Sequence, residues 1–340
     1  MRLKSIDILK LFAMFLVIWG HCVQFLLTSH YFDEPVFVYI HSFHLPLFFM
    51  ISGLFVQSKE WRDGGRYILV KARQLLLPCI TWGLLMSAGN LLQPILTGTE
   101  ANIPLWRTIL TNFWFLKSLF VCFLLWIVSH LLFRKRWLAI LISLIASLFI
   151  TEWGVQWMYP SFVVGACIGG YMDDFRRHSI PIAVTAILSG VLLLFWWDAS
   201  CFRIPSIYAL LSGSVENIPH ALFMRIYRLL VHISLSAGLI ALFLRLEDHV
   251  STNGFLTSAA KWGRLTLGIY IIHSLMFIVR DRLFPSFLCC NSLNPWLFNI
   301  AIAPLLAAVL LSVSAVITSI LSRFPYLSFF LLGTSWPRRQ

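Results

Sequence analysis

The sequence predicts an all-helical protein that crosses a membrane many times. Of its 340 residues, 59% are hydrophobic and only 12% are charged, whereas a soluble domain carries about 25% charged residues. The mean hydropathy is +0.83, and apolar runs recur along the chain at close to the roughly 20 residues that a spanning helix needs. Because lipid offers the backbone no hydrogen-bond partners, these runs are expected to be α-helices.

About ten apolar segments are expected to span the membrane, all within one transmembrane domain that covers residues 1–340. The fifth and sixth segments are the shortest. In chain order, the segments lie near residues 7–28, 36–57, 73–95, 108–132, 137–152, 159–172, 180–198, 222–245, 265–284 and 297–322.

Lysine and arginine gather in alternate connections between these segments. If the N-terminus is cytoplasmic, 19 of the 26 Lys and Arg residues fall on the cytoplasmic side, which is the distribution that membrane proteins favour. An even number of spans then places both termini in the cytoplasm. The net charge of +12 is therefore attributed to flanks that meet membrane lipids, and a nucleic-acid partner is not expected.

The seven cysteines indicate little chemistry. Those inside apolar runs are most simply packing residues. A disulfide from Cys201 to Cys289 or Cys290, in the outer connections, is an open alternative. No Cys/His cluster has the spacing of zinc ligands.

The first apolar segment carries three ionisable side chains, Asp7, Lys10 and His21. At 100° per residue, Lys10 and His21 fall within about 20° of one line along the helix, roughly 16 Å apart. Lys10 near the cytoplasmic edge is also explained by a side chain that extends to the headgroups, and His21 by a hydrogen bond to a neighbouring helix. The functional interpretation is an imidazole that transfers a proton or acts as a nucleophile, with a cation below it that holds an anion.

The second segment adds two histidines and a pair of small residues. His41 and His44 are three residues apart, and therefore neighbours on one helix face. A metal site made with His21 is one alternative, and packing at the membrane interface is favoured over it. Deeper in the segment, Ser52 and Gly53 permit close contact between helices.

A basic stretch follows, with Arg66, Lys71 and Arg73. One interpretation is ordinary basic flanking of a span. The alternative is a site for a polyanion, whose phosphates these side chains would neutralise. No Walker or GxGxxG motif occurs, so a nucleotide would be held by cations and not by a glycine-rich loop.

Three later motifs place ionisable groups in apolar runs. Lys117 lies within NFWFLKSLF, while Arg225 and Arg228 lie three residues apart in MRIYRLL. In GRLTLGIYIIH, Tyr270 and His273 are also three residues apart. Anchoring at the membrane interface is the alternative for each motif; it suits Arg225 best and Lys117 least.

Together, these motifs resemble the acyltransferase 3 family of integral-membrane acyltransferases. The matching residues, in the order that the family shows, are Lys10 and His21, then Phe48, Phe49, Ser52 and Gly53, then the stretch from Arg73 to Pro78, then Trp114, Phe115 and Leu116, and finally Gly263, Leu267, Tyr270 and His273. The resemblance spans nearly the whole chain. The family usually has arginine where this chain has Lys10, so the charge carries over but the two-pronged guanidinium does not.

The resemblance implies transfer of an acyl group, usually acetyl, from cytoplasmic acyl-CoA to a hydroxyl of a cell-surface or envelope glycan or glycolipid. The setting would be the cytoplasmic (inner) membrane of a bacterium. His21 would act as a general base or as a transient acyl carrier, with Lys10 as the innermost cation. Acetyl-CoA is the expected donor, held through its phosphates by Lys10, Arg66, Lys71 and Arg73. The reaction chamber would be formed by His44, Ser52, Lys117, Arg225, Arg228, Tyr270 and His273. No metal is required.

The rival class is a flippase or proton-coupled transporter of a glycan or lipid intermediate, which would also bury ionisable groups. The lack of internal repeats, and the cluster of basic residues expected at the cytoplasmic side, favour the enzyme over the transporter. A non-enzymatic membrane sensor is the third class, but nothing in the sequence resembles an output domain. None of these patterns specifies an oligomeric state.

Overall fold

The computed structural model describes residues 3–27, 30–56, 64–97, 109, 111–278 and 294–335. Every regular element in these ranges is a helix, which confirms the all-helical class. The chain forms two compact units. Unit 1 comprises Met1–Gln57 and Gln156–Thr318, and unit 2 comprises Ser58–Val155 and Ser319–Gln340.

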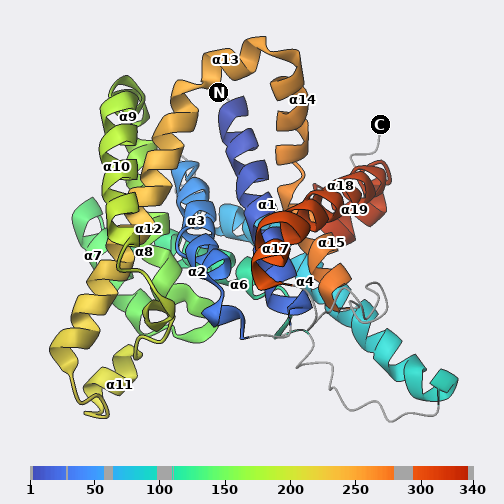
Figure 1. Cartoon of the computed structure of the whole chain (residues 1–340), viewed down its shortest axis with the longest axis horizontal. Coiled ribbons are helices and arrows are strands. Elements are labelled where there is room, and N and C mark those ends of the chain that lie inside the picture. The colour runs from blue at the N-terminus through green and yellow to red at the C-terminus, as the bar shows by residue number, and fades with distance from the viewer. Residues whose placement is uncertain are drawn as a thin grey trace. The chain divides into compact units, whose positions relative to one another are not determined.

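Unit 1 contains the first helices of the chain and most of its second half. Its helices are α1 (Lys4–Leu26), η1 (Tyr31–Asp33), α2 (Pro35–His41), α3 (His44–Leu54), α8 (Val155–Gly170), α9 (Met172–Arg177), α10 (Ser179–Leu194), η4 (Ala199–Phe202), α11 (Ile207–Leu211), α12 (Ile218–Arg245), α13 (Glu247–Thr252), α14 (Gly254–Gly263), α15 (Thr266–Ile278), α17 (Pro295–Leu297), the π-helical η5 (Phe298–Ile302) and most of α18 (Ala303–Leu321). The N-terminus lies beside α13 and α14 at one end of this unit, and α11 lies at the other end (Figure 1).

Unit 2 is built on one long helix. It contains α4 (Gly64–Thr97), α6 (Trp114–Leu132), α7 (Arg136–Leu148), η3 (Glu152–Gly154) and α19 (Pro325–Leu332). Helices α6 and α19 both pack against α4. The indole N–H of Trp82 on α4 donates to the Leu331 carbonyl at 3.1 Å, which ties α19 to the middle of α4.

Six helical stretches of the described residues are long and apolar enough to cross a membrane, with α2 and α3 counted as one stretch and α17, η5 and α18 as another. Three shorter apolar helices, α7, α10 and α15, accompany them. The chain is therefore a multi-pass membrane protein, although fewer described helices reach spanning length than the ten predicted. The difference arises because several predicted segments form shorter helices in the described residues.

Two predicted segments differ in detail from the structure. The segment predicted over 36–57 is broken at Ser42 and Phe43, where Phe43 adopts φ −143° and ψ −22°, into α2 and α3. The segment predicted over 73–95 begins earlier, because α4 starts at Gly64 and its first turns carry the basic stretch. No proline or glycine interrupts the chain between Gly65 and Pro78, so the helix continues through these charges.

Glycines allow the helices of unit 1 to approach at backbone distance. A Cβ atom added to Gly53 of α3 would overlap the Phe162 carbonyl oxygen of α8, and one added to Gly165 would overlap that of Met50. A Cβ atom added to Gly263, at the end of α14, would likewise overlap the Asp7 carbonyl oxygen of α1. Small residues are used in this way where membrane helices pack closely.

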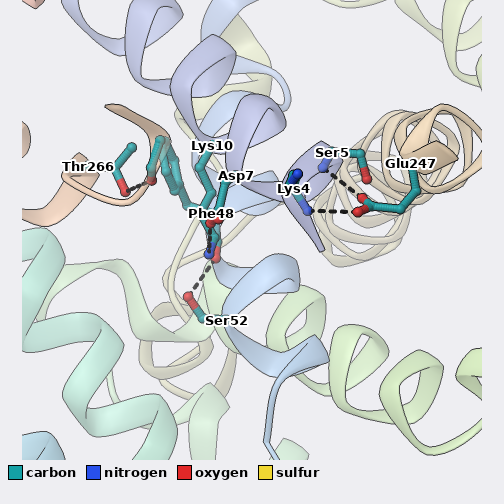
Figure 2. Close-up of polar contacts among 9 residues, drawn as sticks. Lys4, Ser5, Asp7, Lys10, Phe48, Ser52, Glu247 and Thr266 are labelled. Atoms are coloured by element: carbon teal, nitrogen blue, oxygen red, sulfur yellow. Dashed lines mark hydrogen bonds and ion pairs between the residues drawn. The ribbon is translucent and has the colours of Figure 1, made fainter. Parts of the chain in front are cut away.

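A carboxylate from a distant segment caps the N-terminus of α1. Glu247 of α13 accepts hydrogen bonds from the backbone N–H groups of Lys4, at 3.0 Å, and Ser5, at 2.8 Å (Figure 2). These two donors have no partner within the helix, and a negative charge is favourable at this end of its dipole. Burial raises the pKa of Glu247, but its contacts with Ser5 and Lys4 outweigh burial and lower the pKa below its ordinary value. The clamp holds α13 and α14 against the start of α1.

Candidate active site

Two ionisable groups of α1, Asp7 and Lys10, lie one turn apart and contact each other. The Lys10 ammonium lies 3.4 Å from a carboxylate oxygen of Asp7 (Figure 2), and the same ammonium lies 5.2 Å from the centre of the Phe55 ring. Asp7 is buried, with 5% of its surface exposed. Its backbone carbonyl lies directly under Gly263. Lys10 is therefore held by a carboxylate and an aromatic ring.

Further along α1, His21 stacks on His273 of α15. Their ring centres are 5.3 Å apart and the ring planes are inclined by 27°. Phe25 and Phe277 present their rings to His21 at 5.5 and 5.6 Å, and Tyr270 lies edge-on to His273 at 5.5 Å. The structure thus brings together three of the predicted site residues in a wall of aromatic rings.

Each imidazole of this pair has a buried ring nitrogen without a hydrogen-bond partner among the described residues. These atoms are Nδ1 of His21 and Nε2 of His273. The other nitrogen of His273, Nδ1, lies 2.9 Å from the Ile269 carbonyl. Because a carbonyl only accepts, Nδ1 of His273 carries the proton, and Nε2 of the neutral ring presents a lone pair. Most buried polar atoms are satisfied, so this pair is suited to accept a ligand or a proton.

Neighbouring contacts fix the part of α1 that carries His21. The Trp19 indole donates to the Asn299 carbonyl of η5 at 2.9 Å, and the Asn299 amide donates to the buried Glu34 carboxylate. A Cβ atom on Gly20 would lie 2.8 Å from Cε1 of His41, so glycine permits this approach. The π-helical geometry of η5 is of a kind often found at functional sites.

Three more histidines of unit 1 extend away from the stacked pair. The His41 and His44 rings meet edge-on at 4.4 Å, so they remain neighbours across the break between α2 and α3. His44 donates from Nδ1 to the Ile40 carbonyl at 2.7 Å. Helix α3, which carries His44, packs against α1, which carries His21, and against α12, which carries His232.

The remaining predicted residues of unit 1 lie on α3 and α12. The Ser52 hydroxyl donates to the Phe48 carbonyl of its own helix at 2.8 Å, which is an ordinary contact for serine within a helix. Arg225 and Arg228 lie over the Trp157 ring of α8. Arg228 also donates to Nε2 of His232 at 3.4 Å.

Three of the four predicted phosphate-binding cations lie on the first turns of α4 in unit 2, and the fourth, Lys10, lies on α1 of unit 1. Arg66 is exposed. The Lys71 ammonium lies over the Phe123 and Tyr67 rings, at 4.4 and 5.2 Å from their centres. Nε of Arg73 is buried and has no hydrogen-bond partner among the described residues. The three cations belong to one helix.

Lys117 lies on α6 of unit 2, with 5% of its surface exposed. Its ammonium donates to the Ile109 carbonyl at 2.7 Å and lies 5.5 Å from the centre of the Trp153 ring. Phe113, just before α6, and Trp153 both adopt positive φ, at 54° and 50°. Such conformations are strained for bulky residues, so the backbone around this ammonium is held in an unusual shape.

The described residues contain no group of three or more His, Cys, Asp or Glu side chains arranged to hold a metal ion. The alternative of a metal bound by His21, His41 and His44 has no such group to support it. Cys201 is a buried thiol, and Cys289 and Cys290 lie outside the described residues.

Sequence reasoning did not select His232, Trp157 or Glu247. His232 follows Arg228 by four residues, and this helical spacing was a usable signal. Trp157 and Glu247 contact residues that are distant in sequence, so no local pattern marks them.

Comparison with known proteins identifies a family for the chain. Residues 3–323 match the acyltransferase domain family. The chain is 25% identical over 218 residues to the nodulation protein NolL of Mesorhizobium japonicum, which covers 56% of each chain. It is also 25% identical over 209 residues to NolL of Sinorhizobium fredii, covering 58% of this chain and 55% of that relative.

These alignments span just over half the length of the two relatives. No solved structure matches the chain. The family match, by contrast, extends over nearly all of the sequence and includes both helices of the stacked histidine pair. The chain therefore belongs to the acyltransferase 3 family of membrane acyltransferases.

Proposed function

We propose that this protein transfers an acyl group, most simply acetyl, from cytoplasmic acyl-CoA to a hydroxyl of a cell-surface or envelope glycan. The stacked pair of His21 and His273, in a member of an acyltransferase family, is the observation that carries the proposal. The protein would act as one domain over residues 1–340, in the inner membrane of a bacterium. Both relatives are named as nodulation proteins, and their name specifies no acceptor.

The chemistry assigned to His21 is removal of the proton from the acceptor hydroxyl as that oxygen attacks the thioester carbonyl. A thioester C–S bond then breaks, an ester C–O bond forms, and the thiolate of coenzyme A takes up a proton. The aromatic rings around His21 would limit the access of water and so protect the thioester from hydrolysis. A transient acyl-imidazole on His21 is the second route, in which the ring attacks first.

The donor assignment comes from the sequence motifs, which give Lys10 on α1 and three basic residues on α4. Coenzyme A is a polyphosphate on a long flexible arm, so it needs cations for its phosphates and a narrow path for the arm. Arg66, Lys71 and Arg73 offer three positive charges on one helix. Lys10 lies one turn above Asp7 on the helix that also carries His21.

The donor assignment is tested by equilibrium binding of radiolabelled acetyl-CoA to the detergent-purified protein. We expect saturable binding that unlabelled coenzyme A displaces, because the proposed site binds the nucleotide portion. A flippase or transporter of a glycan intermediate has no reason to bind this ligand. Absence of saturable binding by folded protein would reject the acyl-CoA assignment and favour the transport class.

The role of Lys10 is tested separately from its pairing with Asp7. Removing Lys10 alone leaves the buried Asp7 carboxylate without its cation, so the informative variant is the double substitution Asp7→Asn and Lys10→Gln, which leaves the net charge unchanged. We expect it to weaken acetyl-CoA binding about tenfold, the size of one charge-assisted hydrogen bond. Lys10→Arg should bind as well as the natural protein, because the positive charge remains.

The matched control for this test is Lys261→Gln, which removes an exposed cation of α14 at the same end of unit 1. Equal weakening by Lys261→Gln would mean that only the general positive charge of this surface matters. Unchanged binding by the double variant would remove Lys10 from the donor site.

A further inference from the structure

Two arginines of α12 share one aromatic ring at the α11 end of unit 1. The guanidinium carbons of Arg225 and Arg228 lie 4.5 and 4.6 Å from the centre of the Trp157 ring. A single cation over an indole ring is a common stabilising contact. Two like charges on one ring repel each other, so the second arginine needs another explanation.

The polar contacts of these arginines are all with neutral groups. Arg228 donates to the Cys201 carbonyl at 3.2 Å and to His232 at 3.4 Å, and Arg225 donates to the Pro205 carbonyl. None of the carboxylates in the described part of the chain forms a salt bridge with either arginine.

Burial makes this excess of positive charge costly. Arg228 is 8% exposed, and Nε of Arg225 is buried with no hydrogen-bond partner among the described residues. Buried charges in proteins are normally paired, because desolvation of an unpaired charge costs several kcal/mol. Anchoring at a membrane interface explains an exposed arginine, but not the buried Arg228 beside the half-buried Arg225. The site therefore has the character of a receptor for an anion.

The arginine pair is also connected to the candidate active site within the same unit. Arg228 contacts His232 on α12, and α12 packs against α1, which carries His21, and against α3, which carries His44. Both arginines lie in the first half of α12, and the picture shows that α12 begins at the α11 end of the unit (Figure 1). A molecule that entered from the α11 end would meet the arginines before it reached His21.

We propose that Arg225 and Arg228 bind an oxyanion carried by the acceptor, a sugar carboxylate or a phosphate. This inference rests on the proposed function and adds the class of acceptor: an anionic glycan or glycolipid. A guanidinium matches the paired oxygens of carboxylate and phosphate. The pair would hold the acceptor so that a hydroxyl elsewhere on it reaches His21.

The first test measures ligand binding by the full-length protein in detergent, as stabilisation against heat. The anionic probes are methyl glucuronide and glycerol phosphate, and their neutral counterparts are methyl glucoside and glycerol. We expect at least one anionic probe to stabilise the protein at concentrations where its neutral counterpart has no effect. Arg225→Gln should weaken that binding about 10- to 100-fold, as expected for charge-assisted hydrogen bonds.

The controls separate this proposal from folding defects and from the proposed function. Arg203→Gln removes an exposed arginine near the same site and should bind the anionic probe normally. Arg225→Gln should still bind acetyl-CoA, which shows that it is folded and that the donor site is intact. If the natural protein binds the anionic probe but not acetyl-CoA, the proposed function is rejected and the anion site is not.

Two results would overturn the proposal. One is equal behaviour of anionic and neutral probes, or normal binding of the anionic probe by Arg225→Gln. The other comes from the protein in nanodiscs. If phosphatidylglycerol stabilises the protein relative to phosphatidylcholine, Arg225→Gln removes this effect, and the soluble anionic probes have no effect, then the pair binds a lipid headgroup. Binding of an anionic probe that depends on Arg225 in both lipids supports the acceptor assignment.

Discussion

Replacement of His21 by glutamine is expected to lower acyl transfer about a thousandfold, the usual contribution of a positioned acid–base group. Glutamine keeps a polar side chain of similar length but cannot accept the proton of an attacking hydroxyl or carry an acyl group. The measurement is the initial rate of label transfer from radiolabelled acetyl-CoA to an envelope glycan fraction by purified protein. Binding of acetyl-CoA should be retained, because the phosphates are held elsewhere.

The matched control for His21→Gln is His130→Gln. The ring of His130, on α6, also lies beside an aromatic ring, that of Trp126. It belongs to unit 2 and to none of the motifs of the proposed site. We expect this variant to transfer at the natural rate. If His21→Gln transfers the acyl group as fast as His130→Gln does, His21 is not a catalytic residue.

Replacement of Gly263 by alanine is expected to destabilise the protein strongly. The new methyl group would overlap the Asp7 carbonyl oxygen, and a backbone atom cannot move aside as a flexible side chain can. Overpacking typically costs about 1–3 kcal/mol, and occasionally more. The separation of α14 from α1 would disturb the Glu247 clamp and the start of α15, which carries His273. The measurement is the yield and thermal stability of detergent-purified protein.

Gly254→Ala provides the control on the same helix. Gly254 begins α14, and an added Cβ atom would meet nothing within 4 Å. Alanine there should leave stability unchanged or slightly raise it. If both alanine variants behaved alike, the close approach of α14 to Asp7 would not be needed for stability.

The sequence predicted those parts of the site that depend on spacing within one helix. Lys10 and His21 lie on α1, and Tyr270 and His273 lie on α15, as the helical period requires. The stack between His21 and His273 joins residues far apart in the chain. Only a resemblance to a family, and not periodicity, suggested that these helices share a site.

Contacts between segments that are distant in the chain could not be predicted from the sequence. The Glu247 clamp links residues 243 positions apart, and no local pattern marks its carboxylate. The contact of Trp157, on α8, with two arginines of α12 likewise joins residues far apart in the sequence. Helix ends were also misplaced where local breakers were weak: α4 begins before the basic stretch, and the chain breaks at Ser42 and Phe43 without a proline or glycine.

The most direct test of the proposed acyl transfer uses sealed proteoliposomes, with radiolabelled acetyl-CoA on one side of the membrane and glycan acceptor on the other. We predict that label will appear on the glycan as an ester that mild base removes, with the natural protein and with His130→Gln but not with His21→Gln. Label that stays on coenzyme A with the natural protein, or equal transfer by His21→Gln, would contradict the account.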